Sequence, residues 1–194
     1  MSQPAPIPAP RPALQQRVAA AILEAAARVF AARGEQANMG DVAAAAGVAR
    51  ATLYRYFPSR RALLDELAEL AVSAAVARLA SARIHEVAPA EGVTRAVRAL
   101  VDVGDYFVVL VRELRANPGE LERRLAEPLR GLLERGQSTG DIRVDMPSSW
   151  LTDSLVGLVV SVLPSTRELG TEDLVAAISS LFLDGARARH LRSQ

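Results

Sequence analysis

DVAAAAGVARATLYRYFPSRRALL, the stretch from Asp41 to Leu64, indicates more about fold and function than any other part of the sequence. It contains two short helical patterns that meet at Gly47, and a third helix begins soon after Pro58. Glycine accepts the backbone angles of a tight turn, and a residue that precedes proline is pushed out of the helical region. Two short helices at such a turn are typical of a helix-turn-helix, in which the second helix lies against DNA.

The second short helix, expected over about residues 50–56, has two unlike faces. Leu53 and Phe57 are four residues apart, so they share one face and form its apolar side. Arg50 fits a bidentate contact to guanine. The alternative is that the motif is only a packing corner, with Tyr54 packed against the first helix. The polar face offers hydrogen-bond donors to bases and phosphates, namely Arg50, Thr52, Tyr54 and Tyr56.

The helix that follows the motif offers a further phosphate site at its beginning. Ser59 can cap this helix, and Arg60 lies in its first turn. Backbone N–H groups without helical partners and the helix dipole both favour an anion at such a helix end. We therefore expect Arg60 and this helix end to hold a DNA phosphate.

Charge is distributed unevenly along the chain. The formal net charge is only +1, but residues 1–62 carry eight arginines against three acidic residues. Residues 63–194 carry fifteen arginines against nineteen acidic residues, and the chain contains no lysine. A basic N-terminal third indicates that this part of the chain meets a polyanion such as DNA.

Helical periodicity predicts an all-α chain of about nine helices. Residues 1–13 are expected to be a disordered proline-rich tail and residues 14–62 a three-helix DNA-binding helix-turn-helix domain, whose first helix runs from Leu14 to Arg33. Residues 63–194 are expected to form a ligand-binding and dimerisation bundle of five to six helices. Beyond residue 82, helices are expected over about 90–116 (as one or two), 120–139, 149–163 and 171–189.

Three features are expected to shape these later helices. The pair Asn117-Pro118 should end the helix before it. Pro128 should bend the helix over residues 120–139, because proline removes a backbone hydrogen bond. Thr171 should cap the last helix, since acidic residues occupy the next two positions.

The sequence nominates no catalytic residue, metal site or cofactor. Cysteine is absent, which excludes disulfides, thiolate metal sites and cysteine catalysis. His85 and His190 lie far apart without a metal-ligand pattern, and no phosphate-binding loop or nucleophile motif is present. No apolar run is long enough to span a bilayer, and no segment resembles a signal peptide, so we expect a cytoplasmic protein without a membrane partner.

The stretch from Asp41 to Leu64 resembles the DNA-binding domain of the TetR (tetracycline-repressor) family of bacterial regulators. The resemblance implies a homodimer that binds a (pseudo)palindromic double-stranded DNA operator and is released by a small apolar or amphipathic effector. The shared pattern consists of Val42-Ala43, Ala46-Gly47-Val48, Thr52-Leu53-Tyr54, Phe57, Arg60 and Leu63-Leu64. The resemblance implies DNA contacts at Arg50, Ala51, Thr52, Tyr54, Tyr56 and Arg60.

Three positions depart from the family pattern. Ala49 replaces the serine that usually caps the recognition helix, and losing such a cap costs about 0.5–2 kcal/mol. Ala51 replaces the usual glycine, which should favour the helix slightly. Gly40 stands where a polar or basic residue often meets DNA. We therefore expect the recognition helix to be loosely formed in the absence of operator.

The last two long helices are apolar over most of their surface, which indicates burial on several sides. Pairing them with their two-fold mates would form a four-helix dimer interface. The alternative is that they form the core of a single chain. The expected interface residues are Leu151, Leu155, Leu158, Val159, Val162, Leu174, Ile178, Leu181 and Phe182.

Aromatic and apolar residues that suit the wall of an effector pocket occur in two of the bundle helices. Tyr106 and Trp150 each combine an apolar body with one polar atom. The alternative is that these side chains are ordinary core residues. The candidate lining residues are Tyr106, Phe107, Leu110, Leu114 and Trp150.

These features together favour a ligand-responsive transcriptional repressor. Two alternatives stay open from the sequence. One is a helical module that binds a partner protein and no DNA, and the other is a transcriptional activator of the same fold.

Overall fold

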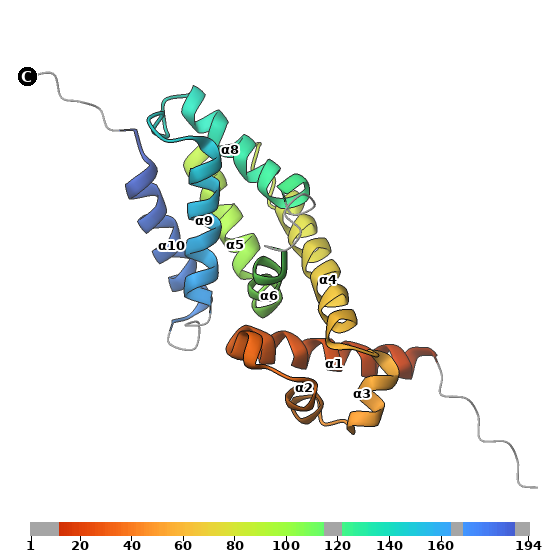
Figure 1. The fold of residues 1–194 in the computed structure, drawn as a ribbon. Helices are drawn as coiled ribbons and strands as arrows, with labels where there is room; N and C mark the ends of the chain where they lie inside the picture. The colour runs from red at the N-terminus through yellow and green to blue at the C-terminus, as the bar shows by residue number, and fades with distance from the viewer. Residues whose placement is uncertain (1–11, 115–121, 164–168, 189–194) are drawn as a thin grey trace, which may run out of the picture. The chain divides into compact units, whose positions relative to one another are not determined.

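The structure is a computed structural model that describes residues 12–114, 122–163 and 169–188 (Figure 1). This described part contains nine α-helices, two short helical turns of other types and one isolated β-bridge. The all-α fold expected from the sequence is confirmed. The chain forms two compact units, residues 1–65 and residues 66–194.

The first unit is built from short helices that follow one long helix. Helix α1 begins at Pro12, inside the stretch expected to be a tail, because proline fits the first turn of a helix. Gly34 has a positive φ of 57° and ends α1 as expected. The elements are α1 (Pro12–Arg33), a 3₁₀ turn (Gly34–Gln36), α2 (Met39–Ala45), α3 (Arg50–Tyr56) and the first turns of α4 (Arg60–Ser81).

Both ends of α2 are fixed by local hydrogen bonds. Asn38 Oδ1 accepts from the backbone N–H groups of Gly40 (2.8 Å) and Asp41 (3.1 Å), and Asp41 Oδ2 accepts from the Asn38 N–H (3.0 Å). This reciprocal capping box satisfies N–H groups that have no helical partner. At the other end Gly47 takes a φ of 65°, and the Val48 N–H returns to the Ala43 carbonyl at 3.0 Å. That closure sets the turn into α3.

The second unit is a bundle in which α5 packs against α8, α9 and α10, while α9 packs against α8 and α10 (Figure 1). Large buried side chains such as Leu100, Phe107, Leu132 and Leu155 fill its core. Gly104, with a φ of 65°, separates α5 from α6. The elements after α4 are α5 (Pro89–Val101), α6 (Asp105–Leu114), a π-helical turn (Glu122–Ala126), α8 (Glu127–Ser138), α9 (Ser148–Val162) and α10 (Thr171–Ala186).

Helices α5 and α8 approach closely because α5 carries glycine at the crossing. A β-carbon at Gly92 would lie 2.6 Å from Leu132 Cδ1 and 2.7 Å from the Ile84 carbonyl oxygen. Arg135 of α8 also holds the segment between α4 and α5 in place. Its guanidinium donates to the carbonyl oxygens of Ile84 (2.9 Å), His85 (2.8 Å) and Val87 (3.0 Å), which would otherwise lack helical partners.

The structure corrects the sequence expectations at both ends of α10. Thr171 is the first residue of the helix and does not cap it, because the extended residue is Gly170. The helix ends at Ala186 instead of residue 189. Arg187 turns into an extended conformation and bridges to Ile142, with the Arg143 N–H donating to the Ala186 carbonyl at 2.8 Å.

The region expected as one bent helix over residues 120–139 changes type instead. A π-helical turn ends at Ala126, and α8 begins at Glu127 with Pro128 in its first turn. Proline has no backbone N–H, so Pro128 cannot donate the hydrogen bond that would continue a regular α-helix from the preceding turn. The expected stop at Asn117-Pro118 lies outside the described residues.

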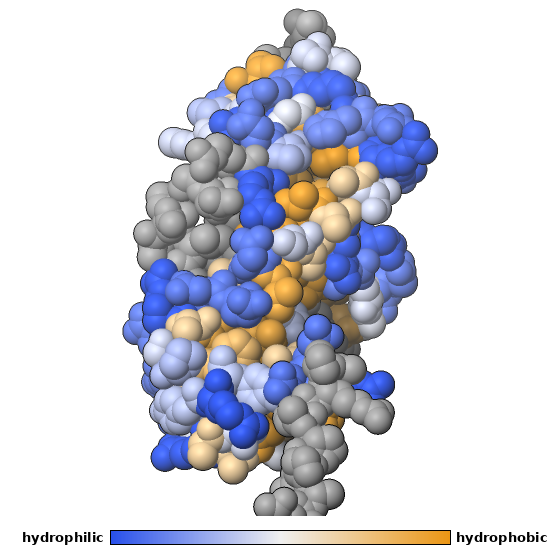
Figure 2. All heavy atoms as spheres, turned by 90° about the vertical axis from the view of Figure 1, so that its right-hand side faces the viewer, coloured by the Kyte–Doolittle hydropathy of each residue, from blue (hydrophilic) through white to orange (hydrophobic). Residues whose placement is uncertain are grey.

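Figure 2 shows one face, on which hydrophobic residues are bordered by hydrophilic ones. None of the helices in the described ranges has both the length and the apolarity needed to cross a bilayer.

Candidate functional site

Five of the six residues expected to contact DNA lie on α3, and the sixth, Arg60, lies at the start of α4. Tyr54 is 48% exposed, Arg50 and Ala51 are exposed, and Thr52 and Tyr56 are half-buried. The opposite side of the helix is buried and holds α3 in the first unit. Its two apolar anchors are Leu53 and Phe57.

Helix α3 begins without a side-chain cap. Ala49 has the extended conformation of a capping residue but offers no side-chain acceptor. Its carbonyl oxygen accepts from the N–H groups of Thr52 (2.9 Å) and Leu53 (3.1 Å). The N–H groups of the first two residues are left to solvent or a ligand, which is the arrangement that makes a helix start receptive to anions.

Arg50 extends from the start of α3 across the first turn of α2. A β-carbon at Gly40 would collide with Nη2 of Arg50 and would lie 3.0 Å from its Cζ. The absence of a side chain at Gly40 therefore makes room for the Arg50 guanidinium. The sequence showed that Gly40 departs from the family pattern but did not reveal this contact, because the two residues meet only after the turn folds.

The Arg60 guanidinium stacks on an aromatic ring of the first unit. Its Cζ lies 5.0 Å from the centroid of the buried Phe30 ring. Ser59 caps α4 as expected, because its Oγ accepts from the Ala62 N–H at 3.1 Å. A cation–π contact fixes the plane of a guanidinium while its edge can still donate hydrogen bonds. Arg60 is thus held at the start of α4.

The arginines of the first unit fall into two groups. Arg28, Arg33 and Arg61 pair with Glu24, Asp41 and Asp65 at 2.7–2.8 Å, so their charges are partly balanced. Arg17 on α1, and Arg50, Arg55 and Arg60 on α3 and the start of α4, form no ion pair within the described ranges. Three of these four uncompensated charges therefore lie on α3 and the start of α4, where a polyanion would be attracted.

The residues expected at a dimer interface divide into buried and outward-facing ones. Leu181 is 63% exposed, and Leu158 and Val162 are half-buried. The other six are buried within their own chain, which supports the alternative of a single-chain core for them. These six are Leu151, Leu155, Val159, Leu174, Ile178 and Phe182.

The candidate pocket residues differ in how far they are exposed. Phe107 is buried, Tyr106 is half-buried, and Trp150 is 63% exposed in the first turn of α9. Leu110 and Leu114 lie in α6, and their side chains are outside the described part. None of these five residues lines the groove between α4 and α5 or the pocket at the start of α8.

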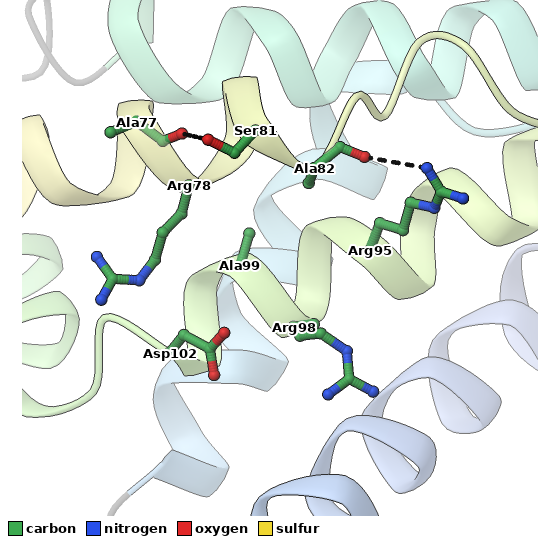
Figure 3. A pocket seen from close by; sticks show the side chains of 8 residues that line it. All are labelled: Ala77, Arg78, Ser81, Ala82, Arg95, Arg98, Ala99 and Asp102. Carbon is green, nitrogen blue, oxygen red and sulfur yellow. Dashed lines mark hydrogen bonds between the residues drawn. The ribbon is translucent and has the colours of Figure 1, made fainter.

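An open groove of about 480 Å³ lies between the last turns of α4 and α5 (Figure 3). This groove was not predicted from the sequence. Arg95 and Arg98 are visible on one face of α5 from their spacing, but Arg78 joins them only through the packing of α4. The residues that line the groove include Ala77, Arg78, Arg95, Arg98, Ala99 and Asp102.

A second pocket of about 320 Å³ lies where the turn after α4 meets the start of α8. Its polar lining includes Arg83, His85, Glu86 and Arg124. Arg83 pairs with Glu86, so part of this lining is already neutralised. In the described ranges no three His, Cys, Asp or Glu side chains are grouped so that they could hold a metal.

Comparison with known proteins agrees with the geometry of the first unit. The family of bacterial regulatory proteins called the tetR family matches residues 22–67, which include α2, α3 and the start of α4. The transcriptional repressor LfrR of Mycolicibacterium smegmatis is 36% identical over 104 residues, 51% of this chain and 52% of that protein. The chain therefore matches about half the length of this curated relative.

Solved structures extend the likeness over most of the chain. The TetR-like regulator LfrR from Mycobacterium smegmatis, in complex with proflavine, has a TM-score of 0.70 and 27% identity, covering 89% of this chain and 97% of that one. The TetR family regulator PfmR from Thermus thermophilus has a TM-score of 0.62 and 28% identity, covering 84% and 97%. The fold and the exposed α3 face define a helix-turn-helix regulator. Residues 22–67 thus resemble the tetR family of bacterial regulatory proteins, and both solved relatives are TetR-type regulators.

Proposed function

We propose that this chain is a transcriptional repressor that reads a double-stranded DNA operator through α3. The proposal rests on one observation. The polar face of α3 points outward with its arginines unpaired, while Leu53 and Phe57 anchor its other face. The curated relative LfrR is named a repressor, which favours repression over activation.

The proposed reading head divides its contacts between bases and phosphates. Arg50 gives a bidentate contact to guanine, and the exposed Ala51 allows the backbone to approach the base edges. Arg60 and the capped start of α4 hold a phosphate, which positions the head without reading sequence. Thr52, Tyr54 and Tyr56 complete the surface with hydroxyl groups.

We propose that two copies bind one operator as a homodimer. One seven-residue helix reads a single half-site, and a two-fold pair reads two half-sites about 34–36 Å apart or a multiple of that distance. The outward faces of α9 and α10 are the proposed contact, because Leu181 is exposed and a β-carbon at Gly157 or Gly185 would meet nothing within 4 Å. A closely approaching partner helix fits such a surface.

We further propose that a small apolar or amphipathic molecule releases the operator. The structural relative LfrR was solved with proflavine, which supports this class of effector. The proposed lining residues are Tyr106, Phe107, Leu110, Leu114 and Trp150. Reciprocity requires the operator to weaken the effector by the factor by which the effector weakens the operator. Because the chromosome is the target, the site of action is the cytoplasm.

Selection of bound duplexes from a random library tests the function. The full chain is incubated with the library at low salt, and retained duplexes are sequenced and checked by fluorescence anisotropy. We expect two inverted half-sites and an affinity that falls steeply with salt. Retention of no duplex at low salt would contradict DNA binding and would favour a protein-binding module instead.

A further inference from the structure

The outermost side chain of α3 belongs to Arg55, which is not among the residues expected from the sequence to contact DNA. Arg55 follows the fully buried Leu53 by two residues and precedes the buried Phe57 by two. Two residues turn an α-helix by about 200°, so Arg55 points away from the side of α3 that both anchors bury. Its side chain is exposed accordingly.

The side of α3 that carries Arg55 is the side that would face the base pairs. The major groove of DNA is about 12 Å wide, and a helix with its side chains is about 10–12 Å across, so the helix surface opposite its anchors meets the floor of the groove. Arginine contacts guanine there through two acceptor atoms of the base. Resting on the DNA-binding function proposed above, we propose that Arg55 is a second base-reading residue, which contacts a guanine in each half-site.

Ala51 leaves space for this contact. It precedes Arg55 by four residues, so the two share a face of α3, and both are exposed. Helical side chains lean toward the N-terminus of their helix, which is the direction of Ala51. A methyl group at this position lets the backbone of α3 approach the bases closely, and that approach brings Arg55 within reach of them.

Arg55 has no acidic partner among the described residues. Its Cζ lies 5.5 Å from the centroid of the half-buried Tyr56 ring. Such a contact orients a guanidinium and leaves its N–H groups able to donate to a base. In the described part of the first unit, three acidic residues pair with other arginines and a fourth lies in the 3₁₀ turn after α1. These are Glu24, Asp41 and Asp65, and then Glu35.

Arg50 and Arg55 are placed to read different bases. They are five residues apart, which is about 7.5 Å along an α-helix, whereas successive bases of one strand are about 3.4 Å apart. The Arg50 guanidinium also lies over Gly40, beside α2, while Arg55 lies opposite the buried side of α3. Substitutions of the two arginines should therefore change base preference at different positions of the half-site.

Arg55→Gln tests the contact, because glutamine suits adenine where arginine suits guanine. Duplexes selected from a random library by the unchanged chain and by the variant are sequenced. Affinities for single-base variants of the operator are then measured by fluorescence anisotropy. For the unchanged chain, we expect a guanine in each half-site whose replacement weakens binding about tenfold or more. In Arg55→Gln this preference should disappear or change to adenine, at a position that Arg50→Ala leaves unaltered.

Arg17→Gln is the matched control, because Arg17 is also exposed and without an ion pair in the described ranges but lies on α1. Whatever its effect on overall affinity, it should leave the preferred sequence unchanged. An Arg55→Gln protein that keeps every base preference would overturn the proposal. A loss by the same factor on all duplexes would also overturn it and would assign Arg55 to a phosphate. If the unchanged chain selects no duplex, the DNA-binding function itself fails, and the proposal for Arg55 fails with it.

Discussion

The guanidinium of Arg50 lies over Gly40, in the space that a β-carbon at Gly40 would occupy. This contact joins the first turn of α2 to the first residue of α3. The family pattern that the sequence resembles predicts a polar or basic side chain at the position of Gly40, and here the guanidinium of Arg50 occupies that space. We interpret Gly40 as a residue that positions Arg50 and so influences base preference without touching a base.

Gly40→Ala should displace Arg50 and weaken operator binding by part of the roughly 1–3 kcal/mol expected for the Arg50 contact. The β-carbon would also lie 2.9 Å from Asn38 Oδ1, so the α2 cap could respond as well. A double-mutant cycle separates the two effects. In an Arg50→Ala background, Gly40→Ala should no longer change operator affinity, as measured by fluorescence anisotropy. An undiminished effect in that background would show that Gly40 acts through the cap instead.

Ala49→Ser should stabilise α3 by about 0.5–2 kcal/mol, because serine supplies the missing acceptor at the N-cap. The measurement is amide hydrogen exchange across residues 48–57 in the free protein. We expect weak protection in the unchanged chain and stronger protection in Ala49→Ser. The control is Ala51→Ser, which adds the same hydroxyl inside the first turn and should not increase protection. Strong protection in the unchanged chain would contradict the expectation of a loosely formed α3.

The helix-turn-helix was predictable from sequence because its determinants are local. Asn38, Gly47 and Ser59 act on backbone groups within a few residues of themselves, so their roles could be assigned without knowledge of the fold. Thr171 was misassigned because a capping residue and a first helical residue differ by one position, and nothing in sequence distinguishes them. Helix α10 ends early because Arg187 bridges to Ile142, a contact between distant segments.

The candidate site was predictable only as a set of residue types. Leu53 and Phe57 are four residues apart and mark the apolar face of α3. The exposed hydrogen-bond donors could therefore be assigned to its other face. The stacking of Arg60 on Phe30 and the fit of Arg50 over Gly40 depend on how separate helices pack, and sequence spacing does not encode that packing. The same reason explains why the groove with Arg78 was missed.

Gly92→Ala should destabilise the second unit. Its β-carbon would meet the Ile84 carbonyl oxygen at 2.7 Å, and a backbone atom cannot move away as a flexible side chain can. Overpacking of this kind costs typically about 1–3 kcal/mol. Gly131→Ala is the matched control, because its β-carbon would meet only His85 Cε1 at 3.8 Å, and it should be neutral or stabilising by up to about 1 kcal/mol. Urea unfolding at a fixed protein concentration gives both values, and equal midpoints would contradict the close approach of α5 to α8.

Leu181→Arg should disrupt the proposed dimer, because the interface would have to bury a charge that has no partner. We expect the dimer dissociation constant to rise by about 100-fold or more, as measured by sedimentation equilibrium. Val144→Arg is the control, since Val144 is also exposed but lies in the loop between α8 and α9. A Leu181→Arg protein that dimerises as tightly as the unchanged chain would place the interface elsewhere.

The most direct test of DNA reading compares Arg50→Ala with Arg60→Ala on two duplexes, the selected operator and a scrambled sequence, at several salt concentrations. The reading head described for α3 predicts that Arg50→Ala costs about 1–3 kcal/mol on the operator and little on the scrambled duplex. Arg60→Ala should weaken both duplexes alike and reduce the slope of log affinity against log salt by about one. Unchanged affinity in both variants, or an equal loss on both duplexes for Arg50→Ala, would contradict the assignment of α3 as the reading helix.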